Sequence, residues 1–240
     1  AYIQLYADRD ILDLFDDDED LQLVNLDTHN ATADGRIILE AGRNIGDLDN
    51  YLEIRMLSSE TINATAGQDL FIHETHQDIV TEQISAPGTV GLWAKGSIVG
   101  DETSSDWDVR ASTIYLIADE GNIGRPGDYL LVDSSYGTAG TLNADGNLSI
   151  YLEEFGGDMN LGTVIMHEPG EIIYLVSPAS ITNGNTSVGN TNVTGDSARF
   201  IAANAIGSSG TSITTELNYL EAEAQNGGAF FINTGPLTIG

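Results

Sequence analysis

The residues of this chain best suited to chemistry are carboxylates, and five of them form one run. Asp16, Asp17, Asp18, Glu19 and Asp20 follow one another in "DLFDDDEDLQL". Because Ca²⁺ is a hard cation that takes several oxygen ligands, Asp16, Asp17, Asp18 and Asp20 are candidate calcium ligands. The run lacks the D-x-D-x-D-G spacing of an EF-hand and the glycine-rich nonapeptide of calcium-binding rolls. The favoured interpretation is a solvated acidic loop, with calcium as the alternative and no cofactor required.

The other titratable groups are poorly placed for catalysis or for metal binding. His73 and His76, in "HETH", are expected on opposite faces of a strand, where they do not readily chelate one metal. Glu153 and Glu154 are adjacent, so on a strand their side chains diverge and form no acid–base pair. The sequence holds no G-x-S-x-G elbow, no phosphate-binding loop and no cysteine. We therefore expect no enzymatic activity.

Two tryptophans are the candidate binding residues. Trp93 and Trp107 flank a loop rich in carboxylates, and an exposed Trp beside carboxylates is a platform for a sugar. Trp93 is expected to point outward from its strand, as are Tyr6, Phe71 and Tyr115. A row of outward aromatics would form a face that meets a ligand or a neighbouring molecule. Ordinary β-propensity explains the same aromatics equally well.

The charge of the chain restricts its partners. Thirty-seven acidic residues face eight basic ones, for a net charge of −29. Nucleic acid and anionic membrane surfaces are excluded, because both require clustered Lys and Arg. No apolar run approaches the roughly 18 residues that cross a bilayer, so we expect no membrane insertion. The charge fits a soluble surface, bound divalent cations or life in high salt.

A short pattern recurs along the chain and predicts the elements that position these residues. Apolar or small residues stand at offsets 0, 2 and 4, a polar bend follows, and another such residue stands near offset 8. "AYIQLYADRDI" and "GRIILEAGRNI" are two examples. Nine copies begin at positions 3, 37, 62, 90, 114, 142, 173, 198 and 220, a mean spacing of about 27 residues.

The pattern predicts a parallel β-helix. Alternation with a period of two is strand periodicity, and the Gly, Asp and Asn between offsets 4 and 8 are bend residues. A four-stranded propeller blade needs about 40 residues, more than the spacing allows. We therefore expect an all-β, single-domain solenoid, right-handed and of about nine coils of roughly 27 residues, over 1–240. Since no capping helix is evident, the segment is interpreted as an excerpt of a longer rod.

A second repeat, with a longer period, accompanies the short pattern. "AGRNIGD", "ADEGNIGR" and "AANAIGS" place Ile-Gly at 45–46, 123–124 and 206–207. The echo indicates that pairs or triplets of coils were duplicated together.

The phrases "VGLWAKGSIVGD", "IYLIADEGNIG" and "ILEAGRNIGDLDNYLEI" resemble the β-helical shafts of secreted bacterial adhesins, the filamentous-haemagglutinin-like exoproteins. The resemblance covers most of the chain, but the secretion-domain motifs of that family are not present. It implies a right-handed parallel β-helix, export to the cell surface, and a structural or adhesive role.

The sequence thus predicts a non-catalytic structural or adhesive segment of a secreted, cell-surface or filament-forming protein. Its expected partners are further copies along the rod axis, since unpaired strand edges are templates for another chain, or glycans on cell surfaces. The alternative is a carbohydrate-active enzyme, a polysaccharide lyase or hydrolase, on the same scaffold. A third interpretation is a surface protein whose charge reflects salt adaptation alone.

Overall fold

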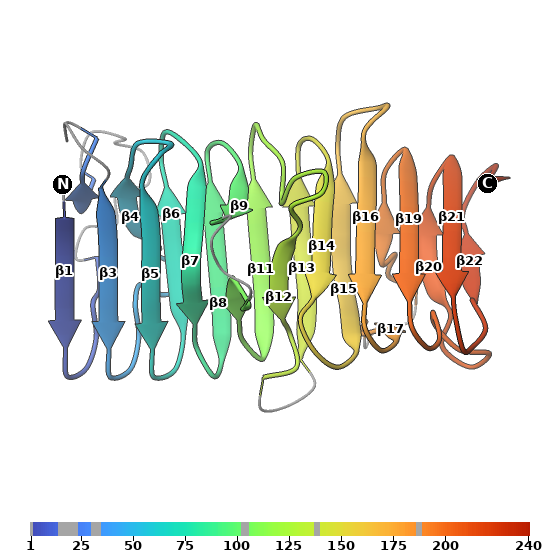
Figure 1. Ribbon diagram of the computed structural model, residues 1–240, viewed down its shortest axis with the longest axis horizontal. Coiled ribbons are helices and arrows are strands. Elements are labelled where there is room, and N and C mark those ends of the chain that lie inside the picture. Colours follow the sequence, from blue (N-terminus) through green and yellow to red (C-terminus); the bar gives the residue numbers. More distant parts are fainter. Residues whose placement is uncertain (1, 14–23, 30–34, 102–105, 137–139, 186–188) are drawn as a thin grey trace.

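Alternating apolar residues build two parallel sheets that face each other across one core. A computed structural model describes residues 2–13, 24–29, 35–101, 106–136, 140–185 and 189–240. In these ranges every regular element is a strand, and every pairing between named strands is parallel. Figure 1 shows the strands side by side along one long axis, with the two termini at opposite ends. The predicted all-β, single-domain solenoid is confirmed.

The first sheet holds twelve strands of the described residues, and the second holds eleven. Strands of the first sheet are β1 (Tyr2–Ala7), β3 (Arg36–Ala41), β5 (Thr61–Ala66), β7 (Ile79–Ser85), β9 (Ile98–Gly100), β10 (Val109–Arg110), β12 (Leu130–Asp133), β14 (Ile150–Glu154), β16 (Ile172–Ser177), β19 (Ser197–Ala202), β21 (Tyr219–Ala224) and β23 (Thr238–Ile239). Strands of the second sheet are β2 (Leu26–Asp27), β4 (Leu52–Arg55), β6 (Leu70–Glu74), β8 (Thr89–Ala94), β11 (Thr113–Ala118), β13 (Thr141–Gly146), β15 (Met159–Met166), β17 (Ile181–Asn183), β18 (Val193–Thr194), β20 (Ile213–Glu216) and β22 (Phe231–Asn233).

The chain coils in a right-handed sense. In Figure 1 the strands of the first sheet lie in front and run downward, and those of the second sheet lie behind and run upward. The chain meanwhile advances from left to right, so that each strand is laid beside an earlier strand of its own sheet.

The core is filled by the residues that the short pattern places at even offsets. Ile37, Leu39 and Ala41 of β3 are each at most 4% exposed, and they pair in register with Ile62, Ala64 and Ala66 of β5. Ile37 thus stacks on Ile62 and Ala41 on Ala66, whereas Leu39 lies beside the smaller Ala64. These inward residues of successive coils together fill the narrow core.

The nine copies of the pattern mark strands rather than coils. The copies at 3, 37 and 62 lie on the first sheet, those at 90, 114 and 142 on the second, and those at 173, 198 and 220 on the first again. The number of residues between paired positions of successive coils varies, from 34 between Ile3 and Ile37 to 25 between Ile37 and Ile62 and 23 between Val109 and Val132.

The chain is built from three equivalent units: β1 to β7, β8 to β15, and β16 to β23. Each unit opens with a strand whose first inward residue is Ile3, Val90 or Ile173. The last strand of the first unit, β7, and the last strand of the second unit, β15, are long and bulged. Each pairs with two short strands of the following unit: β7 with β9 and β10, and β15 with β17 and β18. Equivalent opening strands lie on alternate sheets, β1 on the first, β8 on the second and β16 on the first. Each unit is therefore turned by half a coil relative to the one before, and the predicted grouping of coils is confirmed in this form.

The Ile-Gly pairs sit at the same place in each unit. Gly46, Gly124 and Gly207 have φ values of 61°, 70° and 62°. A Cβ on Gly124 would lie 2.1 Å from the carbonyl oxygen of Tyr151, and one on Gly46 would lie 2.3 Å from that of Phe71. Only glycine combines this left-handed conformation with so close a backbone approach.

Candidate functional site

The most unusual side chains of the molecule are buried carboxylates at the ends of equivalent strands. Glu74 ends β6 and Glu154 ends β14, with exposed fractions of 0% and 1%. An oxygen of Glu74 accepts a hydrogen bond from the backbone N–H of Met56 at 2.7 Å. The carboxylate of Glu154 accepts from the backbone N–H of Ser134 at 3.0 Å and from its hydroxyl at 2.7 Å. In each case the donor lies on the preceding coil.

The third unit has an amide where the first two have a carboxylate. Asn233 ends β22, and its Oδ1 accepts from the backbone N–H of Leu217 at 3.0 Å and from the Thr215 hydroxyl at 2.8 Å. The donors Met56, Ser134 and Leu217 each lie 11 residues after the isoleucine of an Ile-Gly pair. One side-chain-to-backbone contact thus recurs three times, made twice by Glu and once by Asn.

Burial changes the acidity of these carboxyls. Desolvation raises the pKa of Glu74 to about 7, against the opposing effect of hydrogen bonds from the backbone N–H groups of His76, Met56 and Gln77. Desolvation also raises the pKa of Glu154 to about 8, although both Ser134 donors favour the ionised form. Carboxyls that titrate near neutrality are typical of general acids and bases, but structural networks perturb pKa values too.

A second recurring contact involves Asp108. Its Oδ2 accepts from the backbone N–H of Leu131 at 2.8 Å, as Asn25 does from Glu53 and Asn192 from Thr214. Here the second unit has the carboxyl and the other two have amides. Burial raises the pKa of Asp108 to about 7, and the nearby charges of Asp101 and Asp128 raise it further. The Nδ2 of Asn192 donates hydrogen bonds to the carbonyls of Leu161 and Gly162. A protonated carboxyl at the equivalent position can also donate a hydrogen bond, whereas a carboxylate cannot.

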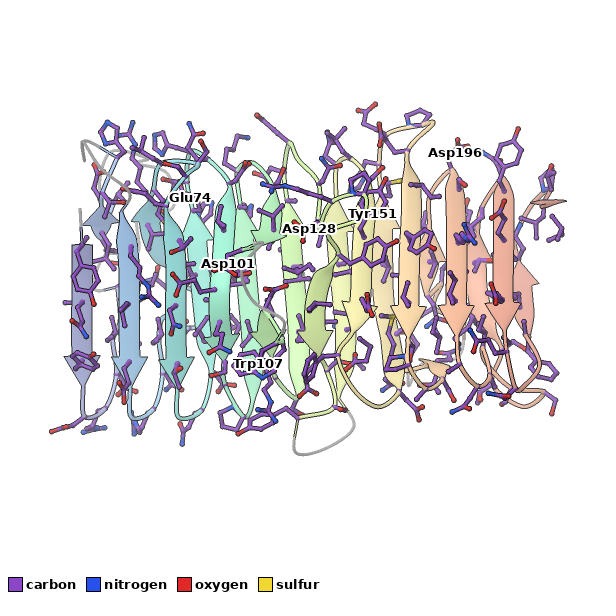
Figure 2. All side chains as sticks on the ribbon, viewed as in Figure 1. Glu74, Asp101, Trp107, Asp128, Tyr151 and Asp196 are labelled. Atoms are coloured by element: carbon purple, nitrogen blue, oxygen red, sulfur yellow. The ribbon has the colours of Figure 1, made fainter. Side chains whose placement is uncertain are left out.

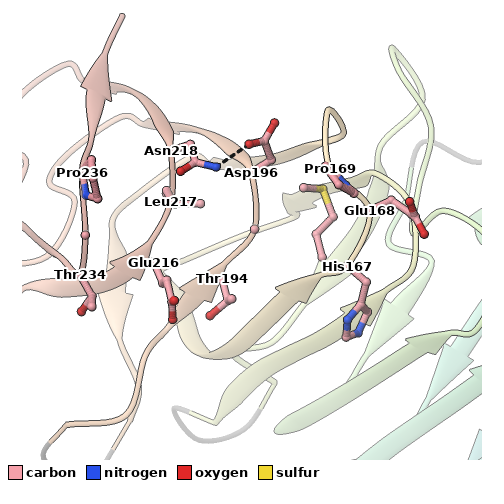
Figure 3. A pocket seen from close by; sticks show the side chains of 13 residues that line it. His167, Glu168, Pro169, Thr194, Asp196, Glu216, Leu217, Asn218, Thr234 and Pro236 are labelled. Atoms are coloured by element: carbon pink, nitrogen blue, oxygen red, sulfur yellow. Dashed lines mark hydrogen bonds between the residues drawn. The ribbon is translucent and has the colours of Figure 1, made fainter.

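A pocket of about 390 Å³ lies where the corners of several late coils meet, and Figure 3 shows its lining. Glu168, Asp196 and Glu216 supply carboxylates, and the lining residues include no Lys or Arg. Asp196 accepts hydrogen bonds from the Asn218 amide at 2.7 Å and from the backbone N–H of Gly170 at 3.0 Å. His167 is in contact with Asp145, 2.6 Å away. These contacts use Asp196 and His167 to hold the corners together.

The two tryptophans predicted as binding residues are half-buried and belong to different sheets. Trp93 lies on β8 in the second sheet, whereas Trp107 immediately precedes Asp108 and β10 of the first. The Trp93 ring stacks on His73 with centroids 4.1 Å apart, and its Nε1 donates to Asp119 at 2.9 Å. The Arg110 guanidinium lies 5.3 Å from the centre of the Trp107 ring. The structure therefore does not bring the two tryptophans together into one platform.

The outward aromatics are only partly exposed. Tyr6 and Tyr115 are 62% and 40% exposed, as expected for outward positions. Phe71 leaves the core row as well, but it is only 5% exposed, because Tyr51 packs edge-on against it at 5.3 Å. Phe71 therefore points outward as predicted, and a loop residue that the strand pattern does not reveal covers it.

A ladder of tyrosines follows the first sheet. Tyr129, Tyr151 and Tyr174 stack with centroids 5.2 to 6.4 Å apart, and Arg199 continues the row over Tyr174. Figure 2 labels Tyr151 in the middle of this face. All three rings contact one another, and each is half-buried, so the tyrosines join neighbouring coils. The sequence signal for it was the recurrence of Tyr one residue outside the core row.

The calcium candidates lie outside the described residues; they are Asp16, Asp17, Asp18 and Asp20. In the part of the chain that the structure describes, no three His, Asp or Glu side chains are grouped so that they could hold a metal ion. His73 lies on β6 and His76 in the bend after it, and Glu153 and Glu154 diverge as predicted, half-buried and buried.

The basic side chains at the bends pair with neighbouring acids. Arg43 binds Asp10 through two hydrogen bonds of 3.1 and 2.6 Å, and Lys95 lies 2.8 Å from Glu120.

Comparisons with family models, with curated proteins and with solved structures found no match to this chain. No helix among the described residues is long and apolar enough to cross a membrane.

Proposed function

We propose that this chain is a structural, non-catalytic segment of a secreted or cell-surface protein, in which stacked coils provide a stiff shaft. The observation that carries the proposal is the threefold contact made by Glu74, Glu154 and Asn233. An amide can hold a backbone N–H as well as a carboxylate can, but it cannot exchange a proton in general acid–base catalysis. Glu74 and Glu154 have pKa values near neutrality, but the equivalent residue of the third unit is Asn233. The property that all three residues share is therefore hydrogen bonding to the preceding coil.

The surface properties support the same function. A net charge of −29 keeps neighbouring rods apart in solution. The resemblance to filamentous-haemagglutinin-like adhesins supports export and an adhesive role, with cell-surface glycans as the partner of the shaft's sides. The outward aromatics Trp93 and Tyr115 are the residues of the second sheet best suited to such contacts.

The second candidate function is a polysaccharide lyase or hydrolase. It is favoured by the pocket of Figure 3, where Glu168, Asp196 and Glu216 line one hollow. Two of the hydrogen-bonding positions of Asp196 are already filled by the chain itself. The shaft therefore remains the better supported function.

Two measurements test the proposal. Antibodies raised against the chain should label intact cells of the producing organism, and labelling only after permeabilisation would overturn the surface location. The purified chain, incubated with acidic and neutral polysaccharides, should release no reducing ends and no unsaturated products. Turnover that is lost in Glu216→Gln would instead establish the enzyme.

A further inference from the structure

A hollow lies on the outer face of the second sheet, in the middle of the rod. Its volume is about 300 Å³, at the lower end of the range of small-ligand sites. Three successive strands of the sheet, β11, β13 and β15, contribute its lining (Figure 1). The outward side chains that line it are Tyr115, Ile117, Asn143, Asp145, Thr163 and Ile165.

Asn143 forms the floor of this hollow. Its Nδ2 donates to the carbonyl oxygen of Ile114 on β11 at 3.3 Å, and its Oδ1 accepts from the backbone N–H of Thr163 on β15 at 3.0 Å. The second contact depends on Gly162, because a Cβ there would lie 2.1 Å from the Oδ1 of Asn143. The amide therefore lies against the sheet where β15 is bulged, and the space above it stays open.

Asp145 gives the hollow an accessible hydrogen-bond acceptor. Its Oδ1 lies 2.6 Å from the Nε2 of His167, which holds the carboxylate in place. The side chain of Asp145 is nevertheless 47% exposed. Since an ionised carboxyl accepts hydrogen bonds through both oxygens, Asp145 can accept from two neighbouring hydroxyls of a ligand.

Tyr115 and Ile117 supply an apolar surface beside that acceptor. In the register of β11 and β13, Tyr115 lies opposite Asn143, and Ile117 lies opposite Asp145. The Tyr115 ring is 40% exposed, so a ligand can reach it. An aromatic surface and a carboxylate thus lie on the same small area of a rigid sheet.

The other two units lack this pairing of an aromatic ring with a carboxylate. At the equivalent positions the first unit has Ile38 and Thr65, and the third has Arg199 and Glu223. The buried hydrogen bonds at the strand ends, by contrast, recur in all three units. The ring and the carboxylate are therefore not required for the coil to form.

We propose that the hollow binds one sugar ring of a neutral glycan, with Tyr115 stacked on the C–H face of the sugar and Asp145 accepting hydrogen bonds from its hydroxyls. A pyranose ring presents both an apolar face and an edge of hydroxyl donors, which match the two surfaces of the hollow. An apolar peptide would bury the Asp145 carboxylate without a donor, and an anionic glycan would be repelled by it and by the net charge of −29. The inference deepens the proposed adhesive role of the shaft and rests on it.

Methyl NMR spectroscopy of the whole chain tests the proposal. The chain, with labelled isoleucine methyl groups, is titrated with cellohexaose, mannohexaose and chitohexaose as neutral probes and with hexagalacturonate as an anionic probe. At least one neutral probe at millimolar concentration should shift the methyl signals of Ile117 and Ile165, and hexagalacturonate should shift neither. The methyl signal of Ile38, at the equivalent place in the first unit, should not move.

Substitutions assign the binding to the two proposed contacts. Tyr115→Ala should weaken binding of that probe by roughly fivefold, and Tyr115→Phe, which keeps the ring, should weaken it less. Asp145→Ala should also weaken binding, whereas Thr65→Ala, at the equivalent position of the first unit, is the matched control and should not. Urea denaturation checks that each variant is folded.

Three results would overturn the proposal. They are no shift of Ile117 and Ile165 with any neutral probe, an equal affinity in Tyr115→Ala, and shifts of both methyl signals when the chain is concentrated without sugar. The last result would show that a second copy of the chain covers the hollow. Labelling of intact cells and release of reducing ends do not depend on this hollow, so failure of the inference is distinguishable from failure of the proposed function.

Discussion

Glu154 holds the backbone N–H and the hydroxyl of Ser134 on the preceding coil, at 3.0 and 2.7 Å. Its carboxyl is buried, and its pKa is raised to about 8. The proton is therefore bound more tightly in the folded state than in the unfolded state. The stabilisation by this bound proton is fully present below about pH 4.3, the pKa of an unfolded Glu, and is lost as the pH rises from there through about 8.

Replacing Glu154 with Gln should remove this pH dependence. We expect Glu154→Gln and the native chain to have similar free energies of unfolding at pH 5, and the variant to be more stable by roughly 2 to 4 kcal/mol at pH 8. Urea denaturation at both pH values measures the difference. Glu153→Gln, on the outward face of the same strand, is the control and should change the free energy by less than about 0.5 kcal/mol. A variant that is destabilised at pH 8 would contradict the structural role.

Asp108→Asn should stabilise the chain above neutral pH for a related reason. Asn25 and Asn192 occupy the equivalent positions, and the pKa of Asp108 is raised to about 7. The stabilisation by the bound proton is therefore fully present below the pKa of an unfolded Asp, about 3.9, and is lost as the pH rises from there through about 7. Thermal unfolding at pH 6 and pH 8 should show a gain for the variant that is larger at pH 8. An equal melting temperature for both proteins at pH 8 would mean that burial does not raise the pKa of Asp108.

Gly124→Ala should be strongly destabilising. The substitution places a Cβ at φ 70° and 2.1 Å from the Tyr151 carbonyl oxygen, so the coil must shift. We expect a loss of more than about 3 kcal/mol, combining left-handed strain and the clash. Gly127→Ala is the matched control, because Gly127 has φ 79° and nothing within 4 Å of its added Cβ. That variant should lose only about 1 to 2 kcal/mol, and equal losses in the two would refute the close approach.

The covered aromatic on the second sheet should contribute more than the exposed one. Phe71→Ala removes a ring that is 5% exposed and packed on Tyr51, and it should cost about 3 kcal/mol. Tyr115→Ala removes a ring that is 40% exposed and should cost less than about 1 kcal/mol. Urea denaturation of both variants checks the order, and the reverse order would contradict the packing described here.

The sequence predicts the strands and the inward row well, because both follow from a local period of two. Ile37, Leu39 and Ala41 are buried as that period requires. The alternation of copies between sheets was not predictable, since Leu70 and Val90 pair across 20 residues and only the register reveals it. The hydrogen bonds from the preceding coil to Glu74, Glu154 and Asn233 were also not predictable, because the three residues differ in type and resemble ordinary polar residues at strand ends.

The central claim is that the units stack by one repeated rule, and a covalent tandem tests it most directly. By register, Gly240 is equivalent to Glu82 and Tyr2 to Thr89, and Ala1 precedes Tyr2 as Gly88 precedes Thr89 in the sequence. Residues 83–87 (QISAP) are therefore the connection that the first unit itself uses. Two copies joined by QISAP should behave in small-angle X-ray scattering as one straight rod with an unchanged cross-section and about twice the length. Scattering from two rods joined at a flexible point, with the shorter mean dimension this implies, would contradict the account.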